Sequence, residues 1–331
     1  MNRPPLKALT STDHSGGAPA PDGENAIEAR NLKKIYRSAN GGEGAHALKD
    51  FSLAIPRGSI FGLLGPNGAG KSTFINILAG LVLKTSGEAS IWGFDIDRNP
   101  RKARVSIGIV PQELNIDPFF TPADLLDLQA GMYGVPKAER RTAEILAALG
   151  LTSKADAYAR TLSGGMRRRL LVAKAMVHNP PILVLDEPTA GVDVELRQQL
   201  WDYVRTLHAA GVTIVLTTHY LEEAEEMCDT IAIINHGQLI ACEPTQQLLA
   251  RISDKRLVVR AAGDATTALP ALAALNAAPL PDGRLAVQYN PAETPVMKLL
   301  EQIRQAGVEI ADISTEESDL EDVFLQLTSR G

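Results

Sequence analysis

A glycine-rich loop between an apolar run and a helical segment is the feature that most limits how this chain can fold. The loop satisfies the pattern Gly-x4-Gly-Lys-Ser in full, and it lies between a buried-strand candidate at 59–64 and a helix at 70–79. Its members are Gly65, Pro66, Asn67, Gly68, Ala69, Gly70, Lys71, Ser72 and Thr73. Glycines allow successive backbone N–H groups to point at phosphate oxygens. The pattern therefore predicts a phosphate-binding site at a strand-to-helix turn.

Lys71 and Ser72 supply a full positive charge and a hydroxyl group, which backbone amides cannot provide. The start of a helix offers a partial positive charge worth up to ~2 kcal/mol, which is too little to hold a triphosphate. We therefore expect Lys71 to contact the β- and γ-phosphates and the Ser72 hydroxyl to bind Mg²⁺. The competing interpretation is a glycine-rich turn followed by an exposed lysine, and the flanking strand and helix argue against it.

Strand and helix patterns alternate through the middle of the chain, which is typical of an α/β fold. A helical insertion is expected from Thr121 to about Ala159, with Thr121 as N-cap, Pro122 in the first helical position and Asp124 nearly completing a capping box. After it we expect strands at 182–186, 213–217 and 230–235, and helices at 194–209 and 220–228.

The two ends of the chain differ in character from its middle. Residues 1–25 are rich in Pro, Gly, Ser, Thr and Asp, so we expect them to be disordered. Order is expected from Ala26, with a strand to Tyr36 and a second strand at 48–55. Residues 255–331 are interpreted as a small appended α+β domain. Its expected strands are 256–261, 284–289 and 308–314, and its last helix is expected to begin with a capping box of Ser318 and Glu321.

Composition excludes several classes of protein. The net charge of −6 argues against nucleic acid as the main partner. Two cysteines without metal-ligand spacing are too few for a disulfide framework. No apolar run approaches the roughly 20 residues that a transmembrane helix needs, and the N-terminus has no apolar core of the signal-peptide kind. We expect a cytosolic chain that reaches a membrane through another protein.

Four polar residues end or follow predicted strands and are candidates for catalysis. Asp186 ends an apolar strand, where its carboxylate can reach Mg²⁺, and Glu187 is the better candidate to orient or deprotonate an attacking water. Gln112 follows the strand-like run 107–110 and can contact both the ion and the water. His219 follows the strand at 213–217 and can donate a hydrogen bond to the γ-phosphate, although a histidine at a strand end is more often structural.

A second phosphate-binding surface is indicated by Ser163, Gly164 and Gly165, which open a helix. One chain rarely needs two such surfaces for one nucleotide. The economical interpretation is that this turn serves the nucleotide bound by another subunit.

Taken in order, these motifs resemble those of an ATP-binding-cassette (ABC) ATPase over about residues 26–245. The signature at 162–166, the turn at 190–193 and the segment 320–324 resemble the ABC-2-type exporter branch. The resemblance implies a P-loop NTPase core at 26–250, with a helical subdomain at about 112–180 and an antiparallel β subdomain. Met166 and Val192 depart from the more widespread Gln and Leu, but both are tolerated in resembling exporters.

The resemblance also implies roles for individual residues. Tyr36 matches the aromatic residue that stacks on adenine, and Asp193 matches an acidic residue at the dimer interface. Ser163 and Gly165 match groups that touch the γ-phosphate bound by the partner subunit. The implied assembly is a head-to-tail homodimer that binds ATP and Mg²⁺ and moves an ABC-2-type permease. The chain would then lie at the cytoplasmic face of the cell membrane through that permease.

Three other functions are compatible with the shared motifs: an ABC importer subunit, a non-transport ABC ATPase acting on ribosomes or nucleic acid, and a binding module that does not hydrolyse ATP. Glu187 and His219 argue against the last. The basic run 167–169 lacks interleaved aromatic residues, so we interpret it as a solvated or phosphate-facing helix surface. The acidic run 222–226 is likewise interpreted as a solvated face.

Overall fold

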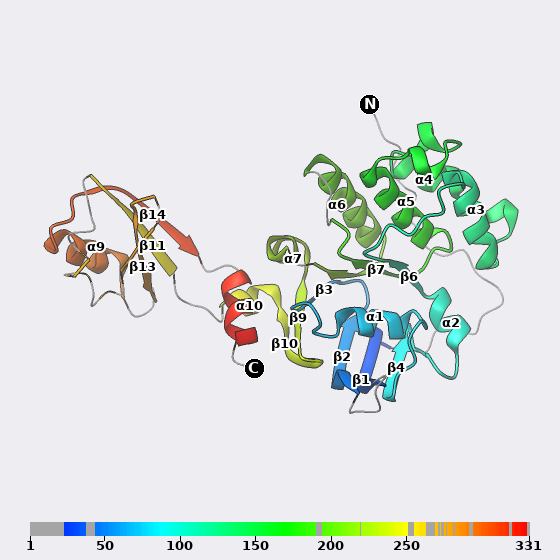
Figure 1. Ribbon diagram of the computed structural model, residues 1–331, viewed down its shortest axis with the longest axis horizontal. Coiled ribbons are helices and arrows are strands. Elements are labelled where there is room, and N and C mark those ends of the chain that lie inside the picture. The colour runs from blue at the N-terminus through cyan, green and yellow to red at the C-terminus, as the bar shows by residue number, and fades with distance from the viewer. Residues whose placement is uncertain are drawn as a thin grey trace. The chain divides into compact units, whose positions relative to one another are not determined.

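The computed structural model divides into two compact units, Met1–Glu243 and Pro244–Gly331 (Figure 1). It describes residues 23–37, 44–189, 194–218, 220–250, 255–262, 269–270, 272, 275, 277–280, 282–290, 294–317 and 320–329. The expectations for residues 1–22, Asp193, His219 and Ser318 fall outside these ranges. Across the described ranges, no helix is both long enough and apolar enough to cross a membrane.

A six-stranded sheet with the order β10-β9-β3-β8-β7-β6 forms the centre of the first unit. The strands are β3 (Ile60–Leu64), β6 (Ile107–Val110), β7 (Ile182–Asp186), β8 (Thr213–Thr217), β9 (Thr230–Asn235) and β10 (Gln238–Pro244). The pairings of β3 with β8 and β9, of β7 with β8 and of β6 with β7 are parallel. Parallel strands bring their carboxyl ends to one edge of a sheet, so the segments after β3, β6, β7 and β8 meet there.

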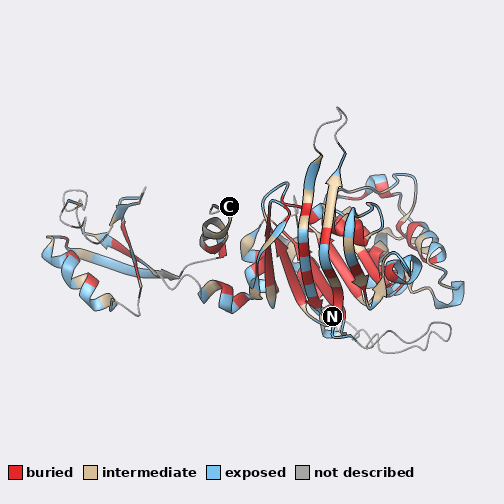
Figure 2. Ribbon diagram, turned by 90° about the horizontal axis from the view of Figure 1, so that it is seen from below, coloured by how far each residue is buried: buried red, intermediate tan, exposed pale blue. Residues whose placement is uncertain are grey.

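A second, antiparallel sheet has the order β2-β1-β4-β5. Its strands are β1 (Asn25–Tyr36), β2 (Ala45–Pro56), β4 (Ser86–Ile91) and β5 (Phe94–Asp95). The first two were expected, although β2 begins earlier than residue 48. The sequence interpretation missed β4 and β5. Many strand residues of this unit are buried (Figure 2).

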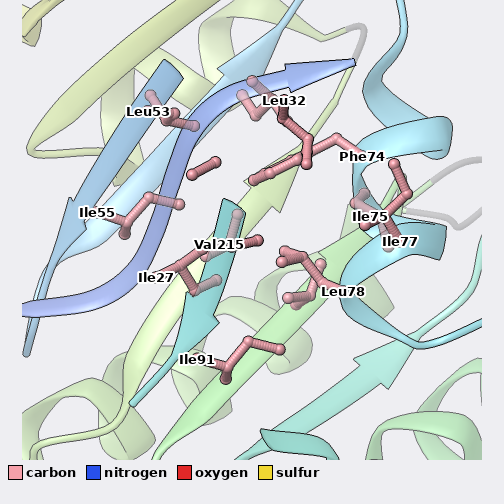
Figure 3. Close-up of a cluster of buried hydrophobic side chains, with 14 of the residues drawn as sticks. Ile27, Leu32, Leu53, Ile55, Phe74, Ile75, Ile77, Leu78, Ile91 and Val215 are labelled. Atoms are coloured by element: carbon pink, nitrogen blue, oxygen red, sulfur yellow. The ribbon is translucent and has the colours of Figure 1, made fainter. Parts of the chain in front are cut away.

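Helix α1 (Lys71–Leu78) lies against both sheets and fills the core between them. Phe74, Ile77 and Leu78 of α1 lie near Ile27, Ile55 and Ile91 of the antiparallel sheet and Val215 of β8 (Figure 3). The rings of Phe51 and Phe74 lie 5.1 Å apart between centroids. This packing holds the loop before α1 at the edge where the parallel strands end.

In the described part of the first unit, the other α-helices are α2 (Pro100–Val105), α3 (Pro122–Met132), α4 (Thr142–Ala148), α5 (Gly164–Met176), α6 (Val194–Ala209) and α7 (Leu221–Met227). The predicted cap of α3 is confirmed, because the Thr121 side chain accepts a hydrogen bond from the Asp124 backbone N–H at 3.1 Å. Helices α3, α4 and α5 pack on one another. Helices α3 and α4 fall within the insertion expected from Thr121 to about Ala159, and α5 begins beyond it. Helix α2 was not expected.

The second unit contains an antiparallel sheet with the order β12-β13-β11-β14. Its elements are α8 (Thr245–Ala250), β11 (Lys255–Ala261), β12 (Ala278–Pro279), β13 (Leu285–Tyr289), α9 (Val296–Gln305), β14 (Ile310–Glu317) and α10 (Leu320–Ser329). Leu299 and Ile303 of α9 pack on Leu257 and Val287 of the sheet. The unit is therefore α+β, and it has a core of its own.

Truncating Phe74, which is 1% exposed, should test whether the packing of α1 stabilises the first unit. We expect Phe74→Ala to lower the free energy of unfolding by about 3–5 kcal/mol, because it removes a large buried side chain and leaves a cavity. Phe74→Leu should cost clearly less. Urea denaturation followed by circular dichroism measures both, and equal losses for the two variants would contradict this account.

Candidate active site

The glycine-rich loop connects β3 to α1 and depends on glycine for two different reasons. A Cβ on Gly65 would lie 2.2 Å from the Ile234 carbonyl oxygen, so the chain passes too close for a side chain. Gly70 has a φ of +114° in the left-handed region, and a Cβ there would meet the Ala47 carbonyl oxygen at 2.6 Å. The spacing of the motif therefore follows from the backbone path as well as from phosphate chemistry.

The Lys71 side chain is buried and turns back onto this loop. Its Nζ donates hydrogen bonds to the Gly65 carbonyl oxygen and, at 3.1 Å, to that of Pro66. Burial lowers the pKa of Lys71, while the charges of Glu187 and Asp186 act in the opposite direction. A phosphate group in the loop would offer this ammonium a full negative charge in place of two neutral carbonyls.

Asp186 lies at the carboxyl end of β7, directly opposite Thr217 of β8. The Thr217 hydroxyl donates a short hydrogen bond to Asp186 Oδ1. Burial raises the pKa of Asp186, and the bond from Thr217 opposes that rise. The sequence interpretation missed Thr217, whose only signal was its position at the end of the neighbouring parallel strand.

Glu187 has a φ of +47°, which is unusual for a residue other than glycine. Its backbone N–H donates to the Thr217 carbonyl oxygen at 3.0 Å, so β8 holds this conformation. Gln112, which follows β6, donates from Nε2 to Glu187 Oε2 at 2.7 Å. The structure thus joins two of the predicted catalytic residues by a direct hydrogen bond across 75 positions of sequence.

The interpretation of the basic run 167–169 as a solvated or phosphate-facing surface is wrong for two of its three arginines. Arg168 and Arg169 are only 5% and 9% exposed, because this side of α5 packs on its neighbours. Arg168 Nη1 donates to the Pro111 carbonyl oxygen at 2.9 Å, next to Gln112. Arg169 Nη1 donates to the Leu149 carbonyl oxygen at 2.7 Å. Burial lowers the pKa of both guanidinium groups.

The acidic run at 222–226 also differs from its interpretation. Glu223 is only 6% exposed and accepts hydrogen bonds from the hydroxyls of Thr189 and Thr218. The buried residues of α7 are Glu223, Ala224 and Met227, so its buried side includes a carboxylate that has polar partners of its own. The solvated interpretation is therefore wrong for this residue.

The second predicted phosphate surface lies at the start of α5. Ser163 is the N-cap, and its side chain accepts from the Met166 backbone N–H at 3.2 Å. Ser163 and Gly164 are both exposed, and a Cβ built on Gly164 would meet nothing within 4 Å. Tyr36 at the end of β1 is 39% exposed, and Lys34 Nζ lies 4.7 Å from the centre of its ring.

Oxygen ligands for a magnesium ion are present only in part. Across the described ranges, no group of three or more His, Cys, Asp or Glu side chains could hold a metal ion by itself. Mg²⁺ commonly takes one or two protein carboxylates and completes its shell with water and substrate phosphates. Asp186, the Ser72 hydroxyl and the Gln112 carbonyl oxygen suit such an ion when a nucleotide supplies the other ligands.

A cavity of about 410 Å³ lies beside these residues. Its lining includes Asp186, Pro111, Arg104 and Lys174. In its wall the rings of Tyr133 and His178 stack, with centroids 3.7 Å apart and planes within 3° of parallel. His178 Nε2 lies 3.3 Å from the Ile107 carbonyl oxygen, and burial lowers the pKa of His178 to about 4.

A phosphate loop, two strand-end carboxylates and a parallel sheet together define a nucleotide-binding P-loop protein. A family model described as "ABC transporter" matches residues 48–190. The linearmycin resistance ATP-binding protein LnrL of Bacillus subtilis is 36% identical over 92% of this chain and 98% of its own length. The daunorubicin/doxorubicin resistance ATP-binding protein DrrA of Streptomyces peucetius is 36% identical over 92% of each chain. The Nod factor export ATP-binding protein I of Ralstonia nicotianae is 39% identical over 84% of this chain and 88% of its own.

Solved structures agree with these relatives. The dimeric post-hydrolysis structure of the ATP-binding cassette MJ0796 with ADP and Pi aligns with a TM-score of 0.60 and 28% identity. The alignment covers 66% of this chain and 98% of that one. The chain belongs to the ABC transporter family, and it is an ATP-binding subunit with ATPase activity. The predicted resemblance to the exporter branch and the predicted fold class are confirmed.

The buried His178 should make stability depend on pH. Its pKa of about 4 in the folded chain lies below the usual 6.5, so the folded state binds fewer protons than the unfolded state. The stabilisation is present above pH ~6.5 and is lost as pH falls toward 4. Between pH 7 and pH 5 we expect the wild-type chain to lose about 2 kcal/mol more than His178→Phe, which keeps a stacked ring. Urea denaturation at both pH values measures this, and equal losses would contradict the assignment.

Proposed function

We propose that this chain is the ATP-hydrolysing subunit of an ABC-2-type exporter and that it works as a head-to-tail homodimer. The proposal rests on one observation above all: Lys71, Asp186, Glu187 and Gln112 meet at one sheet edge, while the Ser163 turn presents a separate exposed helix start. Residues 26–250 would form the ATP-binding domain, with a helical subdomain at about 112–180. Residues 255–331 would form a separate small domain.

ATP would be held by the backbone N–H groups of the loop at 65–73 and by the Lys71 ammonium, with Tyr36 stacked on adenine. Mg²⁺, held by Ser72, Asp186 and Gln112, would neutralise charge that develops on the transferred phosphoryl group. Ser163, Gly164 and Gly165 of one copy would complete the site of the other, with Asp193 at the interface between them. This division of ligands requires two chains for each pair of nucleotides.

Hydrolysis would depend on freeing Glu187 to act on water. Its carboxylate accepts a hydrogen bond from Gln112 in this structure, so the amide occupies one of the oxygen atoms that a lytic water needs. When Gln112 turns toward the nucleotide, Glu187 can orient the water in line with the γ-phosphate, and His219 can donate a hydrogen bond to that phosphate. The Gln112 side chain would thus take part both in binding Mg²⁺ and in freeing the Glu187 carboxylate to act on water.

The permease would bind at the cavity beside Gln112. Pro111 and Asn115, on either side of Gln112, line this cavity, and Leu81 of its lining is 78% exposed. Met132, next to Tyr133 in the sequence, is 75% exposed. An apolar helical segment of an ABC-2-type permease fits such a surface and would hold the chain at the cytoplasmic face of the membrane.

The names of the relatives favour export over the alternatives. LnrL and DrrA are named for resistance, and the Nod factor protein is named for export. This disfavours the importer alternative. The net charge of −6 disfavours a non-transport ATPase that acts on nucleic acid.

Blocking hydrolysis should trap the proposed dimer. We expect Glu187→Gln to retain ATP binding and to migrate at twice the monomer mass with ATP and Mg²⁺, because two composite sites then hold the chains together. Size-exclusion chromatography with light scattering measures this. The matched control, Lys71→Ala combined with Glu187→Gln, should stay monomeric. A Glu187→Gln chain that stays monomeric at saturating ATP would contradict the head-to-tail model.

Charges on the exposed apolar residues Leu81 and Met132 should weaken binding to the permease. We expect Leu81→Glu with Met132→Glu to reduce the membrane protein that co-purifies from solubilised membranes about tenfold, as the loss of a central apolar contact does. ATPase activity of the isolated chain should be unchanged. The control is Met297→Glu, which alters an exposed methionine of the second unit. Undiminished recovery of the membrane protein would contradict this docking site.

A further inference from the structure

The buried carboxylate of Glu223, on α7, links two loops of the candidate active site. Its Oε2 accepts a hydrogen bond from Thr189 Oγ1 at 2.9 Å and another from Thr218 Oγ1 at 3.1 Å. Thr189 and Thr218 are 1% and 2% exposed. Two hydroxyls from different loops therefore meet on one oxygen atom away from water.

Each hydroxyl lies next to a residue of the proposed hydrolysis step. Thr189 is two positions after Glu187, in the segment that follows β7. Thr218 directly precedes His219, in the segment that follows β8. Its hydroxyl also accepts from the Tyr220 backbone N–H at 3.0 Å. The Glu223 side chain thus joins the chain just after the proposed base to the chain just before the γ-phosphate donor.

Arg197 is the charge partner of Glu223, but it forms no hydrogen bond with the carboxylate, so the link between the two loops depends on the two threonine hydroxyls. Arg197 Nε lies 3.3 Å from Glu223 Oε1, which is close enough for an ion pair, but neither atom makes a hydrogen bond. A buried carboxylate is costly unless hydrogen bonds and charge compensate it. An apolar side chain would anchor α7 without this cost, so simple packing does not account for a carboxylate at this position.

We propose that Glu223 is a positioning residue for ATP hydrolysis: by binding Thr189 and Thr218 together, it sets the placement of the Glu187 loop relative to the segment that follows β8. This rests on the proposed roles of Glu187 and His219. Glu223, which is 6% exposed, would act through the two threonines and not on the reacting atoms. Because small displacements of a water-positioning pair act on the chemical step, kcat depends on this link and ATP affinity does not.

The test removes each hydroxyl without changing side-chain volume. Thr189→Val and Thr218→Val should each lower kcat for ATP hydrolysis about tenfold to a hundredfold, as misplacement of catalytic groups does. The KM for ATP and the binding of ADP should stay within about twofold of wild type. Thr189→Ser and Thr218→Ser keep the hydroxyl and should restore most of kcat. Thr206→Val is the matched control, because it removes an exposed hydroxyl bonded to the Asp202 carbonyl oxygen of α6.

Every outcome of this test supports or overturns the proposal. A fall in kcat in both valine variants, with KM unchanged and recovery in the serine variants, supports the proposal. Wild-type kcat in the valine variants overturns it, and so does an equal loss in the serine variants. Thermal melts identify any variant that fails to fold. If one valine variant is unfolded, the valine variant at the other threonine decides the test, because each substitution removes one of the two hydrogen bonds to Glu223. If Lys71→Ala leaves ATPase activity unchanged, the proposed function itself has failed; if it abolishes activity while the valine variants keep theirs, only this inference has failed.

Discussion

The parallel pairing of β7 with β8 is the constraint on which the rest of the site depends. It places Asp186 opposite Thr217, whose hydroxyl holds the carboxylate and whose carbonyl oxygen holds the Glu187 backbone in its left-handed conformation. The same edge receives the phosphate loop after β3 and Gln112 after β6. A shift of one residue in this pairing would turn the side chains of one strand to the opposite face of the sheet and separate these groups.

Buried polar links join the site to the helices around it. Arg168 reaches the Pro111 carbonyl oxygen from α5, the helix that begins at the Ser163 turn. Gln112 then reaches Glu187, and the cavity proposed for the permease borders the same loop. A movement of α5 or of a segment bound in the cavity therefore acts on the same amide. This arrangement offers a physical route between a partner protein and the hydrolysis step.

Local signals predicted the elements that are determined by neighbouring residues. The phosphate loop, the Thr121 cap and the strands β7, β8 and β9 are of this kind, because each has a continuous pattern in sequence. Strand β4 escaped prediction because its Gly and Ser residues break that pattern and its pairing with β1 lies far along the chain. The burial of Arg168 and Glu223 was not predicted, for a related reason. Periodicity assigns charges to solvent, and only tertiary hydrogen bonds allow these two to be buried.

The central claim is that each ATP site is built from two chains, and mixing inactive chains tests it most directly. Lys71→Ala disables the loop of its own chain, and Ser163→Arg disables the turn offered to the other. We expect each variant alone to be inactive. An equal mixture should recover up to about a quarter of wild-type ATPase activity, because half of the dimers then contain one intact composite site. A mixture as inactive as its parts, or full activity of Ser163→Arg alone, would contradict the claim.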